Sequence, residues 1–228
     1  MICTSIVPGT NEEALSLLAR ALPGADLVEL RIDRIERPDL PLLLHAGKER
    51  LLVTIRRRDE GGFFASCENR RMELLREAID LGARYVDIEA RTGAVAVGRL
   101  GKAIRARKGK TKLIVSHHDL EGTPSRQTLV KRLKASRALG ADIVKIVTLA
   151  QKVEDNLRVL DLIPQALAMG QDIIAFCMGA RGRLSRVAAP LLGSCMSYAS
   201  LEDGAESAPG QLTAGEMEAI LGILQASS

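Results

Sequence analysis

The sequence predicts an α/β protein that folds as a single (βα)8 barrel, a TIM barrel, over residues 1–228. Three observations predict this fold: short β-branched runs alternate with helical patterns, there are eight such runs, and no low-complexity linker divides the chain. Strands that alternate with helices form parallel βαβ units, and eight such units in one chain are typical of this barrel. A doubly wound open sheet is the main alternative, but the turn after the first strand, Val-Pro-Gly-Thr-Asn, lacks the glycine-rich phosphate pattern.

The predicted strands are short runs of apolar and β-branched residues, and the predicted helices are the periodic segments between them. In chain order, we expect strands at residues 2–7, 26–33, 51–56, 85–89, 113–118, 142–148, 172–178 and 194–199. We expect helices at residues 12–21, 68–81, 124–139 and 153–168, and a final helix at about 214–225. The helical segments after the second and seventh strands show the weakest patterns.

The composition is that of an ordinary globular protein, with 46% hydrophobic and 26% charged residues. No basic and apolar leader is recognisable, and no apolar run approaches the roughly 18–20 residues that span a bilayer. The four cysteines are scattered without a C-x-x-C pair, which indicates neither a zinc site nor a disulfide framework. We therefore expect reduced thiols in a cytoplasmic protein that has no membrane partner.

Basic residues are densest between Lys102 and Lys112, and the formal net charge is +4. A nucleic-acid surface would also need aromatic rings for stacking, but the chain has two Tyr, three Phe and no Trp. We interpret the cluster as a solvated helix end and loop rather than a nucleic-acid site. The mild positive charge suits an enzyme with an anionic small-molecule substrate.

Charged residues alternate with apolar ones in several predicted strands, although strands buried on both faces normally read as continuous apolar runs. Because side chains alternate between faces, the apolar set should meet the helices and the charged set should point into the barrel. Any one of these charges could be a simple ion pair, but together they indicate a site at the carboxyl ends of the strands. The inward charges are Glu29, Arg31, Asp33, Arg56, Asp87, Glu89 and Lys145.

The same alternation separates two adjacent histidines at the end of the fifth predicted strand. His117 shares a face with Leu113, whereas His118 shares a face with Ser116. If the apolar face meets the helices, His118 points into the pocket and His117 lies in the outer layer. His118 is therefore the candidate for proton transfer.

Seven stretches, in order along nearly the whole chain, resemble the type I 3-dehydroquinate dehydratase family. They are ELRID at 29–33, LVTIR at 52–56 leading to EGG at 60–62, VDIE at 86–89, VSHHD at 115–119, ADIVKI at 141–146, LSR at 184–186 and SAPGQ at 207–211. The resemblance implies a barrel enzyme of the shikimate pathway that dehydrates 3-dehydroquinate, commonly dimerises, and uses neither metal nor cofactor. Leu120 stands where some members carry an aromatic residue.

The resemblance also implies roles for individual residues. Lys145 matches the Schiff-base lysine, His118 the general acid and base, and Glu60 the carboxylate that orients the histidine. The implied substrate ligands are Glu29, Arg31 and Arg56 for the ring hydroxyls, Arg186 and Gln211 for the carboxylate, Ser207 in a loop that closes over the site, and Ser5 as the best match in the first strand.

This residue set suits elimination of water next to a ketone. A neutral lysine amine can convert the ketone into an iminium, which is a better electron sink, and a histidine can move the proton near neutral pH. A class I aldolase is the closest alternative, with residues 178–182 as a possible phosphate cradle. A catalytically silent barrel that binds pathway metabolites is the second alternative, although a pure binder has no need of Lys145.

Overall fold

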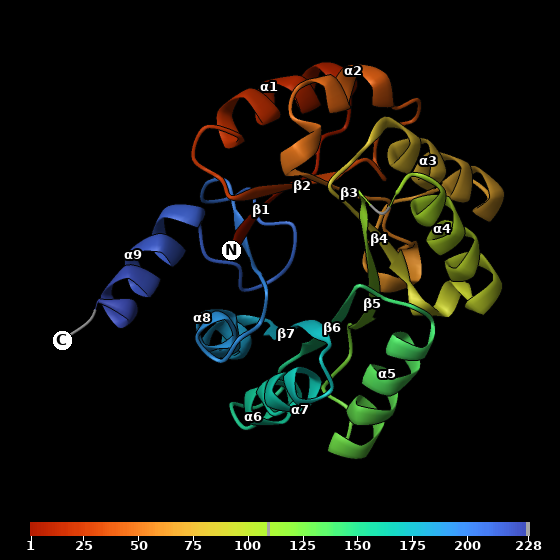
Figure 1. The fold of residues 1–228 in the computed structure, drawn as a ribbon. Helices are drawn as coiled ribbons and strands as arrows, with labels where there is room; N and C mark the ends of the chain where they lie inside the picture. Colours follow the sequence, from red (N-terminus) through yellow and green to blue (C-terminus); the bar gives the residue numbers. More distant parts are fainter. Residues whose placement is uncertain (109, 227–228) are drawn as a thin grey trace.

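A computed structural model describes residues 1–108 and 110–226 of the chain. The predicted domain, residues 1–228, also includes residues 109, 227 and 228, which lie outside the described residues. Eight parallel strands form one sheet in the order β7-β6-β5-β4-β3-β2-β1-β8, and the helices lie around its outer face (Figure 1). The predicted barrel class is therefore confirmed.

The observed strands follow the predicted ones closely. They are β1 (Ile2–Ile6), β2 (Leu27–Arg31), β3 (Leu51–Thr54), β4 (Tyr85–Glu89), β5 (Lys112–Asp119), β6 (Ile143–Leu149), β7 (Asp172–Met178) and β8 (Ser197–Ser200). The eighth strand begins later than predicted, because the residues before it are bonded elsewhere. The Ser194 backbone N–H donates to Ala189 in α8, and the Cys195 N–H donates to Ile173 in β7.

The helices alternate with the strands as predicted, but one predicted helix is two. They are α1 (Asn11–Ala21), α2 (Leu40–His45), α3 (Glu68–Leu81), α4 (Ala94–Ala106), α5 (Arg126–Ala138), α6 (Asp155–Leu160), α7 (Leu162–Ala168), α8 (Arg183–Leu191) and α9 (Ala214–Gln225). The prediction of one helix over 153–168 was wrong, because Pro164 lacks the N–H that would donate to Leu160 in a continuous helix. In the part of the chain that the structure describes, no helix has the length and apolar character to cross a membrane.

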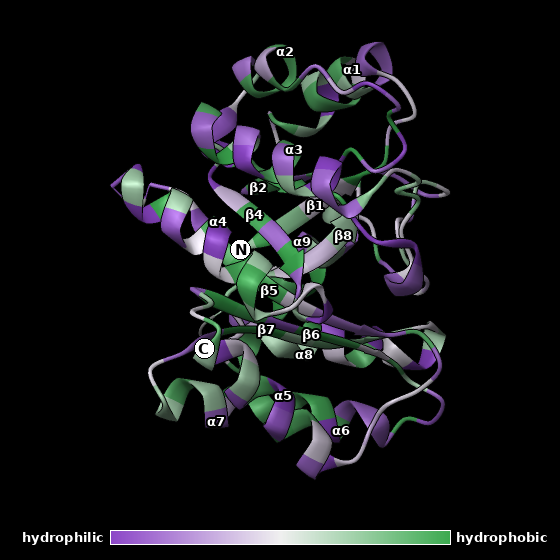
Figure 2. Ribbon diagram, turned by 90° about the vertical axis from the view of Figure 1, so that its right-hand side faces the viewer, coloured by the Kyte–Doolittle hydropathy of each residue, from purple (hydrophilic) through white to green (hydrophobic). Residues whose placement is uncertain are grey.

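Two sets of apolar residues sandwich the strands. The outward side chains of β2 and β4, such as Leu30 and Ile88, pack with the helices in the largest buried cluster. The inward side chains of several strands, such as Leu52, Ile114 and Ile174, form a separate cluster inside the barrel. Several strands are accordingly largely hydrophobic, while the helices carry both polar and apolar residues (Figure 2).

The barrel is closed between β7 and β8 by side chains and single hydrogen bonds. Within the described residues these two strands share no continuous ladder, whereas β8 pairs with β1 from Ile2–Ser197 to Ser5–Ser200. The Cys195 N–H to Ile173 bond, at 3.0 Å, joins the two sides near the amino ends of the strands. Higher up, the rings of Phe176 and Tyr198 meet across the seam. This seam places two aromatic rings beside the site described next.

Candidate active site

A pocket opens inside the barrel at the carboxyl ends of the strands, where this fold places its chemistry. Every site residue that the sequence predicts lines it, with the exception of Ser5. The predicted residues that line the pocket are Glu29, Arg31, Arg56, Glu60, His118, Lys145, Arg186, Ser207 and Gln211. Three strands (β2, β5 and β6), helix α8 and the loops after β3 and β8 therefore bring together residues that are far apart in the sequence.

Lys145 lies in the middle of β6 with its side chain inside the barrel and only 4% exposed. Its Nζ is 3.3 Å from Asp87 Oδ2 and 3.7 Å from Glu29 Oε1. Burial opposes ionisation of the Asp87 carboxyl, but the cations of Arg56 and Lys145 outweigh it and hold the pKa of Asp87 below its ordinary value. The amine is thus held by two carboxylates at a fixed position in the pocket.

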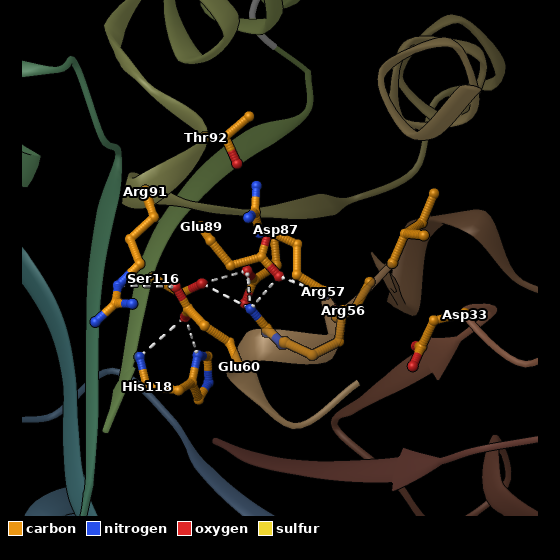
Figure 3. Close-up of polar contacts among 12 residues, drawn as sticks. Asp33, Arg56, Arg57, Glu60, Asp87, Glu89, Arg91, Thr92, Ser116 and His118 are labelled. Carbon is orange, nitrogen blue, oxygen red and sulfur yellow. Dashed lines mark hydrogen bonds and ion pairs between the residues drawn. The ribbon is translucent and has the colours of Figure 1, made fainter. Parts of the chain in front are cut away.

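Arg56, just past β3, joins β4 and β5 to the site through its guanidinium. It contacts Asp87 through two hydrogen bonds of 3.0 and 2.8 Å, Glu89 at 3.0 Å and Ser116 Oγ at 2.8 Å (Figure 3). Such a fork pairing with carboxylates fixes both partners in orientation. Asp87 therefore has its charge shared between Arg56 and Lys145.

Arg71 of α3 supports this network from outside the barrel, and its side chain is fully buried. Its Nη1 lies 2.6 Å from Glu89 Oε2, and further bonds reach Glu68 and the Thr92 hydroxyl. Glu89 consequently lies between two arginines, one inside and one outside the strand layer. Sequence reasoning missed Arg71, because nothing in a helical pattern marks an arginine that reaches back to a strand.

We expect the replacement Arg71→Met to lower the free energy of unfolding by about 3–5 kcal/mol, because it leaves the buried Glu89 with a single cation. Arg70→Met is the matched control, since Arg70 is the half-exposed neighbour on the same helix and pairs with exposed Glu73. Its cost should stay below about 1 kcal/mol. Urea unfolding measures both values. Equal midpoints for the two variants would contradict a supporting role for Arg71.

Glu60 and His118 form a hydrogen-bonded pair at the mouth of the pocket. Glu60 ends a short 3-10 turn (Arg58–Glu60) after β3, and its Oε2 lies 2.9 Å from His118 Nδ1 and 3.0 Å from the His118 backbone N. Its Oε1 faces Arg91 Nε at 3.9 Å (Figure 3). One carboxylate oxygen thereby fixes both the main chain and the ring of the histidine.

The electrostatics of this pair leave the outer nitrogen of the ring free to take a proton. Burial lowers the pKa of His118 well below its ordinary value, and the cations Arg56 and Lys145 add to this effect. Burial also raises the pKa of Glu60 to about 7, although Arg56 opposes it. Where Glu60 is ionised, Nδ1 carries the hydrogen that the carboxylate accepts, so Nε2 of the neutral ring has an open lone pair.

His117 points the other way, as the alternation along the strand predicts. Its Nε2 lies 3.0 Å from the Ser136 hydroxyl on α5, in the layer between strand and helix. Burial, joined by the nearby Arg132, lowers the pKa of His117 to about 4. His117 is therefore a neutral, hydrogen-bonded residue of the outer layer.

Arg31 reaches the pocket with Asp33 as its ion-pair partner. Its Nε and Nη2 each lie 2.7 Å from an oxygen of Asp33. Asp33 Oδ2 also accepts the backbone N–H of Phe63 at 2.9 Å, which ties the loop after β3 to β2. The pair keeps Arg31 in place and leaves Glu29 to face Lys145.

Arg186 and the 202–211 loop form the other side of the pocket. Arg186 is 1% exposed, and it donates to the backbone oxygens of Tyr198 at 3.4 Å and Pro209 at 3.3 Å. Burial lowers its pKa to about 10, so it is still a cation near neutral pH. The loop folds back on itself, because Gln211 Oε1 accepts the Ser207 backbone N–H at 2.7 Å.

Gly210 allows this loop to lie directly on the β7–α8 turn. Its φ is +77°, and a Cβ there would come within 2.3 Å of the Gly179 carbonyl oxygen. The Gly179 N–H also donates to Pro209 O at 2.9 Å. Two backbone segments therefore meet without side chains between them, which places the loop over the pocket.

Among the predicted substrate ligands, all of which the structure describes, Ser5 alone does not line the pocket. Its hydroxyl donates to Glu29 Oε2 at 2.5 Å, while Thr54 donates to Glu29 Oε1 at 2.9 Å. Ser5 therefore orients Glu29 from the neighbouring strand. Among the described residues, no group of three or more His, Cys, Asp or Glu side chains could hold a metal ion.

Fold and site together define a TIM-barrel protein with a buried lysine and a histidine–carboxylate pair in one pocket. The sequence model of the type I 3-dehydroquinase family matches residues 2–228. The chain belongs to this family. A 3-dehydroquinate dehydratase of Thermococcus gammatolerans is 42% identical over 226 residues, which cover 98% of this chain and 99% of the relative.

Solved structures give the same result. The 3-dehydroquinate dehydratase of Geobacillus kaustophilus has a TM-score of 0.91 at 28% identity, covering 100% of this chain and 91% of that one. The type I enzyme of Clostridium difficile, solved with covalent modified comenic acid, has a TM-score of 0.86 at 27% identity, covering 98% and 91%. The family resemblance that the sequence stretches indicate is therefore confirmed.

Proposed function

We propose that this protein is a hydro-lyase that dehydrates 3-dehydroquinate to 3-dehydroshikimate, in the shikimate pathway of aromatic amino-acid biosynthesis. The observation that carries the proposal is the position of Lys145, a buried amine that faces the pocket and is a diagonal neighbour of His118 on the adjacent strand. The family membership of the whole chain supports the same reaction. No metal or cofactor enters the proposed mechanism.

Lys145 is the nucleophile of the proposed reaction. Its Nζ attacks the ketone carbon of the substrate to give a carbinolamine, which loses water and becomes an iminium. The iminium withdraws electrons from the neighbouring carbon, so the proton on that carbon becomes easier to remove. After elimination, water adds to the product iminium, releases the ketone and returns the free amine.

His118 moves the proton. Its open Nε2 takes the proton from the carbon next to the iminium, the electron pair forms the new double bond, and the hydroxyl on the following carbon departs. The proton on the ring passes to that hydroxyl, which leaves as water. Glu60 holds the tautomer and stabilises the ring while it is positively charged.

Substrate binding divides between the two sides of the pocket. Arg186 is the proposed partner of the substrate carboxylate, with Gln211 and Ser207 from the loop beside it, because a guanidinium binds a carboxylate in a fork geometry. Glu29, Arg31 and Arg56 are the proposed partners of the ring hydroxyls. We further propose that the 202–211 loop opens to admit substrate and excludes water when it is seated.

We expect kcat/KM to fall about tenfold per pH unit below pH 7, because the pKa of Glu60 in the free enzyme is about 7 and its protonation removes the acceptor for His118 Nδ1. Glu60→Gln should lower the plateau and abolish this acidic limb. Ionisation of Glu60 should favour catalysis but lower the free energy of unfolding. A carboxyl whose pKa is raised by folding contributes stability below its unfolded value and loses it as pH rises through 7.

Glu60→Gln should therefore unfold at a higher temperature than the wild type at pH 8, while both proteins unfold alike at pH 4. Initial rates from pH 5 to 9 and thermal melts at the two pH values measure these effects. An unchanged acidic limb in the glutamine variant would assign that limb to another group.

The aldolase alternative receives no support from the turn after β7. A phosphate cradle there would need its basic side chain free, but Arg181 donates to the backbone oxygen of Gln151, outside the pocket. A barrel that only binds metabolites would not need the amine of Lys145 or the proton-transfer pair of His118 and Glu60. Both alternatives predict no dehydration of 3-dehydroquinate.

The direct test combines a rate with a covalent trap. The protein is supplied with 3-dehydroquinate, and the absorbance of the conjugated product is followed. In parallel, borohydride is added during turnover, and the peptides are analysed by mass spectrometry. We expect a reduced adduct on the peptide that carries Lys145. Turnover without any adduct would overturn the Schiff-base mechanism, and absence of turnover would overturn the proposed function.

The assembly and location of the protein are separate parts of the proposal. We infer a homodimer, in line with the family resemblance, and sedimentation analysis tests it. We infer a cytoplasmic enzyme because all four cysteines are unpaired. The basic residues around α4 are partly paired with acids, as Arg107 is with Asp80 at 3.1 Å, which fits a solvated surface.

A further inference from the structure

Two of the five aromatic residues of this chain meet inside the pocket. Phe176 of β7 and Tyr198 of β8 have ring centroids 5.8 Å apart, and their planes are tilted by 46°. The pair lies at the seam of the barrel, where the two strands have no continuous ladder within the described residues. In a chain with so few aromatic residues, this placement calls for a physical explanation.

Each ring of the pair faces one cation of the proposed active site. Lys145 Nζ lies 4.0 Å from the centroid of Tyr198, and Arg186 Cζ lies 4.6 Å from the centroid of Phe176. Both distances are within the roughly 6 Å over which a cation is attracted to the face of a ring. One ring thus faces the amine proposed to attack the ketone, and the other faces the guanidinium proposed to bind the carboxylate.

The hydroxyl of Tyr198 contributes nothing visible to this arrangement. It is buried and has no hydrogen-bond partner among the described residues. Buried tyrosines usually pair their hydroxyl, so the position is not explained by hydrogen bonding. The part of Tyr198 that contacts the site is its ring.

The carboxylates near Lys145 are already engaged by other groups. Asp87 accepts two hydrogen bonds from Arg56, and Glu29 accepts the hydroxyls of Ser5 and Thr54. The face of Tyr198, in contrast, has Lys145 as its cation and cannot take up a proton. A ring face can therefore stabilise a cation without removing the proton that the reaction must move.

We propose that Tyr198 is a positioning residue for Lys145. The face of its ring stabilises the iminium cation relative to the neutral carbinolamine, and the face of the Phe176 ring keeps the Arg186 guanidinium in its orientation. The inference rests on the proposed function and deepens it. Loss of water turns an uncharged carbinolamine into a planar cation at the nitrogen. Because the ring is attracted to the cation and not to its neutral precursor, it favours this step and the accumulation of iminium.

The test is a series of rings at position 198 that keep their shape while the charge on the face is weakened. Wild type, Tyr198→Phe, and phenylalanines with one, two and three ring fluorines inserted at position 198 are compared, together with Tyr198→Leu. For each protein we measure kcat, KM, and the fraction trapped on Lys145 by borohydride with 3-dehydroquinate. Tyr85→Leu is the matched control, because Tyr85 belongs to the same interior cluster but not to the pocket.

We expect Tyr198→Phe to stay within about twofold of wild type, and kcat and trapping to fall stepwise with each fluorine, to about tenfold below wild type. KM should change less than kcat, and Tyr85→Leu should keep its kcat. The fluorinated series remains decisive if Tyr198→Leu does not fold. Equal kcat across the fluorinated rings would overturn the proposal by reducing Tyr198 to a space-filling role.

A loss in Tyr198→Phe as large as in Tyr198→Leu would also overturn the proposal, since it would assign the effect to the hydroxyl. These outcomes differ from a failure of the proposed function. In that case the wild type itself neither dehydrates 3-dehydroquinate nor forms the Lys145 adduct, and both proposals fail together. A wild type that turns over with a flat fluorinated series rejects the role of Tyr198 alone.

Discussion

Replacing Lys145 by alanine will lower turnover of 3-dehydroquinate by at least about 10³-fold, because no other described amine reaches the pocket to form the iminium. Without the iminium, removal of the neighbouring proton would leave an unstabilised enolate. His118 and its carboxylate partner would still be present, but they would have no electron sink to work with. Steady-state rates and borohydride trapping measure the loss.

The barrel should persist in Lys145→Ala, because the carboxylates near Lys145 keep their other partners. Asp87 retains the fork contact with Arg56, and Glu29 retains two hydroxyl donors. Lys112→Ala is the matched control, since Lys112 lies on the adjacent strand, is only partly buried, and has its Nζ 3.7 Å from Asp172 Oδ2. Wild-type rates in the control, with a folded but inactive Lys145 variant, are the expected result. Substantial turnover in Lys145→Ala would rule out the covalent mechanism.

The fold was predictable because each strand and helix carries its own periodic pattern. The bounds predicted for β4 and β7 match the structure, and so do those of α3 and α9. The differences occur where a neighbouring segment decides the outcome. The start of β8 depends on hydrogen bonds that residues 194 and 195 make to α8 and β7, and no local pattern contains that information.

Much of the arrangement of the site was also predictable, for a specific physical reason. A charged residue in a strand that is buried on both faces must point inward and find a partner, so Lys145 and Arg56 could be placed in the barrel from alternation alone. The partners themselves were less predictable. Arg31 pairs with Asp33, two residues further along the chain, and alternation alone does not tell which of the inward carboxylates it meets.

The roles of some residues could not be predicted from the alternating pattern of the strands. Arg71 lies on a helix, and its contact with Glu89 depends on how α3 packs against β4. Phe176 and Tyr198 look like ordinary core residues, and only their positions under two cations distinguish them. Ser5 was assigned to the substrate, whereas the geometry pairs it with Glu29.

The two histidines of β5 provide the second large effect, because they are adjacent in sequence and face opposite layers. We expect His118→Ala to lower kcat by about 10²–10⁴-fold through loss of proton transfer. The iminium should still form, since Lys145 and the carboxylates around it are unchanged. Borohydride trapping should therefore remain substantial while turnover falls, which separates this variant from Lys145→Ala.

His117→Ala is the matched control for that experiment, and its cost should appear in stability instead of catalysis. It removes one hydrogen bond to Ser136 on α5, which is worth about 0.5–1.5 kcal/mol, and leaves the pocket intact. We expect kcat within about threefold of wild type and a lower melting temperature. Because one residue of register exchanges the two faces of a strand, equal losses of kcat in the two variants would mean that the inward and outward sides of β5 are wrongly assigned.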